Sequence, residues 1–135
     1  MAHFGHPSQF GYKDVIESFQ AEKFDPDTLV ARYKAAGANY IVTLATHHDN
    51  FDCFDSTYHE LDSVQKGPHK DIVSLWRTPT FKAGLRFGVS SHADERGWNY
   101  MYGALLSDTK GPLAGVPYQG ADPAYVTLYN SPQNP

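Results

Sequence analysis

The sequence has little of three things: cysteine, positive charge and long hydrophobic runs. Its one cysteine, Cys53, cannot form an intramolecular disulfide. Eleven Lys and Arg against fifteen Asp and Glu give a formal net charge of -4, which opposes binding to a phosphate backbone or an anionic membrane surface. Apolar runs such as residues 40–45 are far shorter than the ~20 residues that cross a bilayer. We therefore expect neither nucleic acid nor a membrane as a partner.

The N-terminus also lacks the basic start and apolar stretch of a signal peptide. We therefore expect a cytoplasmic protein by default, with a secreted or periplasmic parent as the alternative. With 135 residues, 41% of them hydrophobic and 14% aromatic, the chain suits one globular domain. Residues 129–135 are expected to form a disordered tail.

Hydrophobic spacing predicts an α/β fold. Helices are expected at residues 13–22, at 26–36, where a proline follows a capping aspartate, and at 68–78, where Pro79 should end or kink the helix. Runs without polar alternation, at about 39–45 and 84–90, are typical of strands buried on both faces of a parallel sheet. The helix at 68–78 would then connect two parallel strands.

Polar side chains follow both predicted strands. His47 and His48 come after the first strand, and His92, Asp94 and Glu95 come after the second. Because the carboxyl ends of parallel strands meet at one edge of a sheet, these groups should share a crevice. Adjacent histidines in an extended segment point in opposite directions, so only one would face a ligand unless the chain turns sharply.

Several chemistries compete for this edge. Metal binding has candidate ligands but no recognised zinc spacing, so no cofactor is expected; these ligands are His47, His48, Asp49, Asp52 and His92. Ser90 and Ser91 do not lie in a nucleophile elbow, and Cys53 is more simply explained as inert packing. Aromatic rings favour a sugar, whose C–H face stacks on them. The alternative is that half of these rings simply close the hydrophobic core. They are Phe51, Phe54, Tyr58, Trp98, Tyr100 and Tyr102.

A set of motifs, in order along nearly the whole chain, resembles the α-L-fucosidases of glycoside hydrolase family 29. They are residues 24–27 (FDPD), 34–40 (KAAGANY), 47–51 (HHDNF), 63–64 (SV), 67–73 (GPHKDIV) and 84–90 (GLRFGVS). Residues 111–118 (GPLAGVPY) and 122–125 (DPAY) resemble an insert of one branch of that family. The HHDNF block is the most specific of these motifs.

The resemblance implies a (β/α)8 barrel and retaining hydrolysis of terminal α-L-fucose on fucosylated glycans or fucosides. His47 and His48 match the histidine pair that contacts the fucose hydroxyls in the family. The family's F-x-H-W-G motif, its aspartate nucleophile and its acid/base carboxylate have no counterpart here. Where many members carry a tyrosine pair, this chain has Ser90-Ser91 followed by His92.

The expected site therefore combines residues of both strand ends. Asp49 is the candidate for one catalytic role and Asp94 or Glu95 for the other. The expected substrate-binding residues are His47, His48, His92 and Trp98. The alternative is a catalytically incomplete fragment that binds fucose or is purely structural.

A whole barrel needs ~250 residues, so the expected fold is a truncated barrel unit. Its strands would have open edges and an uncovered apolar face. We therefore expect a homo-oligomer, in which His47 and His48 of one subunit could lie near Asp94 and Glu95 of another.

Overall fold

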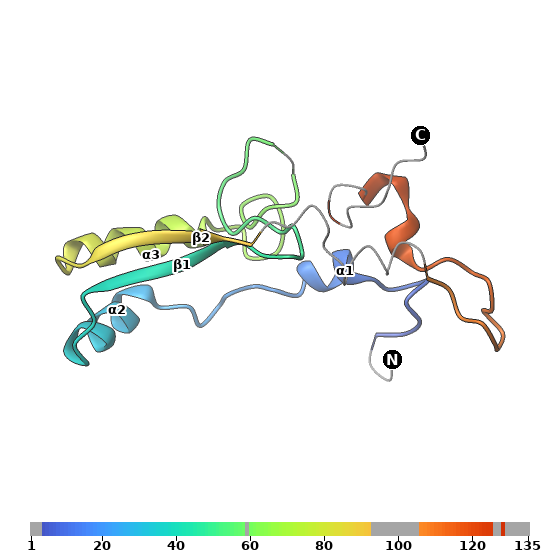
Figure 1. Cartoon of the computed structure of the whole chain (residues 1–135), viewed down its shortest axis with the longest axis horizontal. Coiled ribbons are helices and arrows are strands. Elements are labelled where there is room, and N and C mark those ends of the chain that lie inside the picture. The colour runs from blue at the N-terminus through green and yellow to red at the C-terminus, as the bar shows by residue number, and fades with distance from the viewer. Residues whose placement is uncertain (1–3, 59, 93–105, 126–127, 129–135) are drawn as a thin grey trace.

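The structure is a computed structural model of the whole chain, in which residues 4–58, 60–92, 106–125 and 128 are described. Its helices and strands are α1 (Tyr12–Ile16), α2 (Pro26–Ala35), β1 (Tyr40–Thr46), α3 (Ile72–Lys82) and β2 (Arg86–Ser91), followed by 3-10 helices η1 (Gln119–Ala121) and η2 (Pro123–Tyr125). The molecule is elongated, with the sheet, α2 and α3 at one end, residues 106–118 at the other end and α1 between them (Figure 1). Over the described ranges, no helix is both long and apolar enough to span a membrane.

The two strands form a parallel sheet, as predicted. Tyr40 of β1 pairs with Arg86 of β2, and the pairing continues in register to Leu44 and Ser90. The register then shifts, because Thr46 pairs with Ser91 and Ala45 is the extra residue of a bulge. The bulge lies immediately before the polar residues that follow β1.

The helix predicted at 26–36 is confirmed, and the one predicted at 13–22 is much shorter. In α2, the Asp25 side chain accepts a hydrogen bond from the amide of Thr28, which caps the helix. α1 ends at Ile16, where the chain tightens into a turn closed by a 3.0 Å bond from the Phe19 amide to the Ile16 carbonyl. Ala21 then adopts a φ of 48°, which no helix accommodates.

The helix expected to stop at residue 78 runs on to Lys82 as α3, so of the two effects predicted for Pro79, an end or a kink, the end is wrong. Proline lacks the N–H that would bond to the carbonyl of Leu75. Thr80, the residue after Pro79, donates a 2.7 Å hydrogen bond from its hydroxyl to the Trp76 carbonyl. Pro79 itself is buried. The helix also begins later than predicted, at Ile72, after a cap by Asp71.

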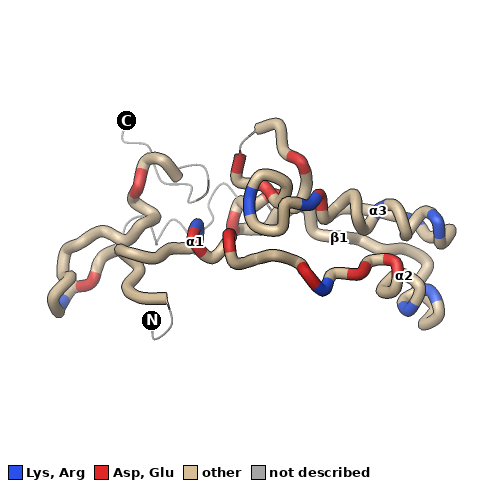
Figure 2. The backbone as a smooth tube through the Cα atoms, turned by 180° about the vertical axis from the view of Figure 1, so that it is seen from behind, with Lys and Arg blue, Asp and Glu red and all other residues tan. Residues whose placement is uncertain are grey.

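Helix α3 covers one face of the sheet, and α2 packs against α3. The Trp76 ring lies 5.2 Å from that of Phe24 and 6.3 Å from that of Tyr33 on α2. Phe81 of α3 contacts Phe87 of β2 at 6.1 Å. Basic residues lie on both helices, seen from behind in Figure 2.

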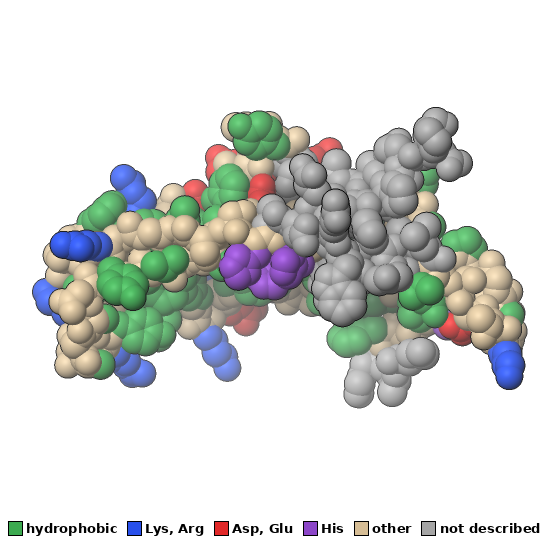
Figure 3. All heavy atoms as spheres, in the orientation of Figure 1, with side chains coloured by type: hydrophobic (Ala, Val, Ile, Leu, Met, Phe, Trp, Pro, Cys, Tyr) green, Lys and Arg blue, Asp and Glu red, His purple; other side chains and the backbone are tan. Residues whose placement is uncertain are grey.

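The opposite face of the sheet is open within the described part of the chain. Tyr40, Val42 and Leu44 of β1 are 65%, 54% and 37% exposed, and hydrophobic side chains spread across this side of the sheet (Figure 3). Burial of the strands on both faces, expected from the sequence, is therefore wrong for the isolated chain. The apolar pattern is present, but only one face has a covering layer.

A hydrophobic core lies between α1, the loop after β1 and the C-terminal segment. It consists of Ile16, Phe51 and Leu128, with Tyr12, Cys53, Leu61 and Tyr125 packed against it. The Asn50 side-chain amide donates 3.2 Å to the carbonyl of Leu128. This core fixes the loop that carries the site. Residues 129–135, expected to form a tail, lie outside the described residues.

Candidate functional site

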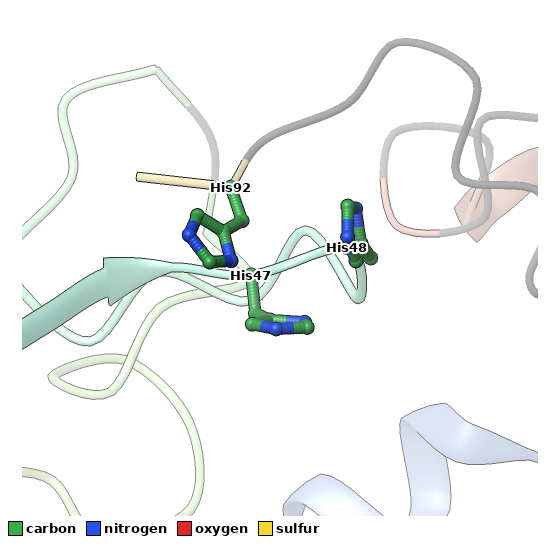
Figure 4. Close-up of side chains that lie close together, drawn as sticks. All are labelled: His47, His48 and His92. Atoms are coloured by element: carbon green, nitrogen blue, oxygen red, sulfur yellow. The ribbon is translucent and has the colours of Figure 1, made fainter. Parts of the chain in front are cut away.

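The chain turns sharply as it leaves β1, which brings two adjacent histidines together. The Asn50 amide donates 3.0 Å to the carbonyl of His47, and Asn50 has a φ of 54°. The rings of His47 and His48 consequently lie 4.6 Å apart, edge to face (Figure 4). In an extended segment the two side chains would point in opposite directions. Because the chain turns sharply here, both imidazoles belong to one site.

His92 joins them from the end of β2. Its amide donates 2.8 Å to the Thr46 carbonyl, which extends the pairing of the two strands by one residue. Its ring lies 5.1 Å from that of His47 and 5.9 Å from that of His48. We call His47, His48 and His92 the histidine cluster. The prediction that these three histidines meet at the carboxyl edge is confirmed.

The loop after β1 is held by a buried aspartate. The Thr46 hydroxyl donates a short hydrogen bond to Asp52, which is only 6% exposed. The Cys53 amide donates 2.7 Å to the Ala45 carbonyl, and the Ser63 amide donates 2.8 Å to the Asp52 carbonyl. Asp52, considered as a metal ligand from the sequence, instead ties the loop to the end of β1.

Both carboxylate oxygens of Asp49 accept hydrogen bonds from the protein. Oδ2 accepts a short bond from the Tyr12 hydroxyl, and Oδ1 accepts a 3.3 Å bond from the Phe51 amide. This geometry favours a positioning role, in which Asp49 ties the histidine-bearing turn to α1. The other expected site residues, Asp94, Glu95 and Trp98, lie outside the described residues, as do Tyr100 and Tyr102.

The remaining nucleophile candidates have structural environments. Burial, aided by the negative charges of Asp49 and Asp52, raises the pKa of Cys53 to about 11. The thiol is therefore protonated at neutral pH and is a poor nucleophile. The Ser90 hydroxyl donates a 3.4 Å hydrogen bond to the Thr43 carbonyl, which links β2 to β1. Of the loop aromatics, Phe51 is buried in the core, whereas Tyr58 is exposed.

A further polar network escaped the sequence analysis. His6 Nε2 lies 2.9 Å from Asp108, which also accepts a 2.7 Å bond from the Tyr118 hydroxyl. The hydrogen bond with His6, then that with Tyr118, lowers the pKa of Asp108, and the bond to Asp108 raises the pKa of Tyr118. These residues connect the N-terminal segment to residues 106–118, and their separation along the chain leaves no local signal.

Replacing Asp62 with alanine should destabilise the loop that supports the site. Asp62 is fully buried, and its Oδ1 accepts bonds of 2.7 and 3.0 Å from the amides of Val64 and Gln65. Loss of that acceptor leaves two amides unsatisfied, so Asp62→Ala should lower the free energy of unfolding by about 3 kcal/mol. Asp62→Asn keeps an acceptor oxygen and should cost less. Equal losses in the two variants, measured by denaturant unfolding, would contradict this role.

The chain is similar in sequence to known alpha-L-fucosidases. Residues 1–123 match the family model described as Alpha-L-fucosidase. The tissue alpha-L-fucosidase of Bos taurus is 34% identical over 85 residues, 62% of this chain and 18% of that protein. The alpha-L-fucosidase of Dictyostelium discoideum is 28% identical over 116 residues, 82% of this chain and 25% of that protein.

Solved structures are similar as well. The Thermotoga maritima alpha-fucosidase in complex with fucose superposes with a TM-score of 0.61 at 29% identity, covering 90% of this chain and 30% of that one. An alpha-L-fucosynthase from the same organism gives a TM-score of 0.63 at 36% identity, covering 67% of this chain and 20% of that one. The chain thus spans less than a third of the length of these proteins.

Proposed function

Because this chain belongs to the alpha-L-fucosidase family, we propose that it binds terminal α-L-fucose and takes part in the retaining hydrolysis of fucosides and fucosylated glycans. The observation that carries the proposal is the histidine cluster at the carboxyl ends of β1 and β2. A neutral imidazole offers one donor and one acceptor, and neighbouring sugar hydroxyls need both. Three imidazoles from two strand ends form a polar surface of the right kind for one sugar ring.

The fold proposal is that β1, α3 and β2 are part of a (β/α)8 barrel. In such a barrel the helices cover the outside of the sheet, and the active site lies at the carboxyl ends of the strands. Here α3 packs on one face of the parallel sheet and the histidines follow the strand ends. The open face with Tyr40, Val42 and Leu44 would then correspond to the barrel interior.

The reaction requires two carboxyl groups about 5 to 5.5 Å apart, one as nucleophile and one as acid. Asp49 is proposed for one of these roles, and Asp94 or Glu95, which follow β2 in sequence, for the other. The hydrogen bonds that Asp49 accepts from Tyr12 and Phe51 favour a positioning role for it. The variant Asp49→Asn separates a catalytic role from a positioning role. If Asp49 is the nucleophile, the variant should lose all turnover, whereas if Asp49 only positions the turn, the variant should bind fucose more weakly.

The test combines turnover with binding. Tag-free protein is assayed with 4-nitrophenyl α-L-fucoside and titrated with L-fucose in a calorimeter. Binding with turnover supports the hydrolase. Binding without turnover supports the second candidate, a catalytically incomplete fucose-binding fragment. Absence of both binding and turnover contradicts the proposal.

We also propose that the chain self-associates through the open face of the sheet. A continuous apolar face is costly in water, and both strands of the sheet have a free edge within the described residues. Light scattering after size exclusion should therefore give a mass above 15.0 kDa. Val42→Lys places a charge on this face and should shift the mass towards the monomer, while Val116→Lys, away from the sheet, should not. A wild-type monomer at micromolar concentration contradicts the proposal.

A further inference from the structure

We propose that the histidine cluster also binds a divalent transition-metal ion, with Zn²⁺ as the expected ligand. His47 and His48 come from the turn after β1, and His92 comes from the end of β2 (Figure 4). One ring nitrogen of each residue lies within 4.8 Å of the other two. Three convergent imidazole nitrogens with an open fourth position are the ligand set of a zinc site that keeps one exchangeable ligand.

The distances allow ligation after small side-chain movements. Zn–N bonds of about 2.0 to 2.1 Å at tetrahedral angles separate the nitrogens by about 3.4 Å. The nitrogens in the structure are at most 4.8 Å apart. His47 and His92 are exposed, so their rings can rotate towards His48 without displacing packed neighbours. The strand pairing at Thr46 holds the two backbones in place during this movement.

His48 provides the fixed corner of the site. It is half-buried, and its Nδ1 is shielded from solvent and has no hydrogen-bond partner among the described residues. A buried nitrogen without a partner is unfavourable. Ligation of a metal by this nitrogen would satisfy it, as a sugar hydroxyl would.

The ligand type selects the class of ion. Within the described ranges, the group contains three histidines and no carboxylate. Imidazole nitrogens suit Zn²⁺, Cu²⁺ and Ni²⁺, whereas Mg²⁺ and Ca²⁺ prefer oxygen ligands. Cys53 is not a member of this group, so its thiol does not enter the proposed ligand set.

The metal and the sugar would use the same nitrogens, so they should exclude each other. This consequence rests on the proposed fucose site, whereas metal binding itself does not. Bound Zn²⁺ would occupy the lone pairs that accept hydrogen bonds from sugar hydroxyls. We therefore expect Zn²⁺ to inhibit fucose binding competitively.

The experiment is calorimetric titration of Zn²⁺ into chelator-treated, tag-free protein, followed by the same titration of His92→Ala and His47→Ala. Each variant should bind Zn²⁺ at least tenfold more weakly than the wild type. His69→Asn is the matched control, because His69 is exposed and its Nδ1 lies 3.2 Å from the Val64 carbonyl, outside the cluster. Asparagine also tolerates the φ of 50° at this position.

Two results would overturn the metal site: no Zn²⁺ binding by the wild type, or equal affinity in the wild type, His47→Ala and His92→Ala. Mg²⁺ in place of Zn²⁺ should bind at least a hundredfold more weakly, and equal binding of the two ions would also overturn it. Repeating the Zn²⁺ titration in saturating L-fucose separates the two proposals. Weakened Zn²⁺ binding supports a shared site, while unchanged Zn²⁺ binding leaves the metal site standing and contradicts the placement of fucose on these nitrogens.

Discussion

His48→Ala should weaken the binding of L-fucose about 30-fold, which corresponds to about 2 kcal/mol. His48 is the half-buried member of the histidine cluster, and its shielded Nδ1 has no partner among the described residues. Removing its ring leaves a sugar hydroxyl without a hydrogen bond at a site that excludes part of the solvent. The affinity is measured by calorimetry, and kcat/KM for 4-nitrophenyl α-L-fucoside should fall by a similar factor.

Two further variants show whether the effect is specific to the site. His47→Ala, whose side chain is exposed, should weaken binding less than His48→Ala, because water can replace its hydrogen bond. His69→Asn should bind fucose like the wild type. Wild-type affinity in both His47→Ala and His48→Ala would remove the histidine cluster from the fucose site. Circular dichroism of each variant checks that the fold is intact.

The elements that the sequence predicted well carry their signals locally. Asp25 and Pro26 specify the start of α2 through a cap and a fixed φ, and the β-branched run of β1 needs no distant partner to be recognised. The meeting of His92 with His47 also followed from sequence, because parallel strands bring their carboxyl ends to one edge.

The features that sequence reasoning missed depend on contacts between distant segments. Asp49 accepts a hydrogen bond from Tyr12, 37 residues away, and Asp108 contacts His6, 102 residues away. No local pattern marks such pairs. The end of α3 was missed for a different reason. The rule that proline ends a helix considers proline alone, whereas here the hydroxyl of the next residue, Thr80, forms a hydrogen bond with the Trp76 carbonyl.

The early end of α1 is also a tertiary effect, and Gly67 is its partner. A Cβ on Gly67 would lie 2.7 Å from the carbonyl oxygen of Ile16 and 2.9 Å from that of Phe19. The loop backbone at Gly67 therefore packs directly against the turn that ends α1. The fit requires glycine for two reasons, the space and the φ of 66°.

Gly67→Ala should therefore lower the free energy of unfolding by about 3 to 4 kcal/mol, the sum of about 1 kcal/mol of backbone strain and about 2 to 3 kcal/mol of overpacking. Gly84→Ala is the matched control, because Gly84 has a φ of 72° and a Cβ there meets nothing within 4 Å in the described part of the chain. That variant should show the backbone strain alone. Denaturant unfolding measures both differences.

The destabilisation by Gly67→Ala should also reach the site. Gly67 packs against the end of α1, and Tyr12 at the start of α1 donates to Asp49, next to His48. Displacing α1 should loosen the turn that orients the two adjacent histidines, so Gly67→Ala should weaken fucose binding even under conditions where the variant is fully folded. Gly84→Ala, at the opposite end of β2 from His92, should not. Equal stability and equal fucose affinity in the two glycine variants would show that the contact between Gly67 and α1 neither supports the fold nor positions the histidine cluster.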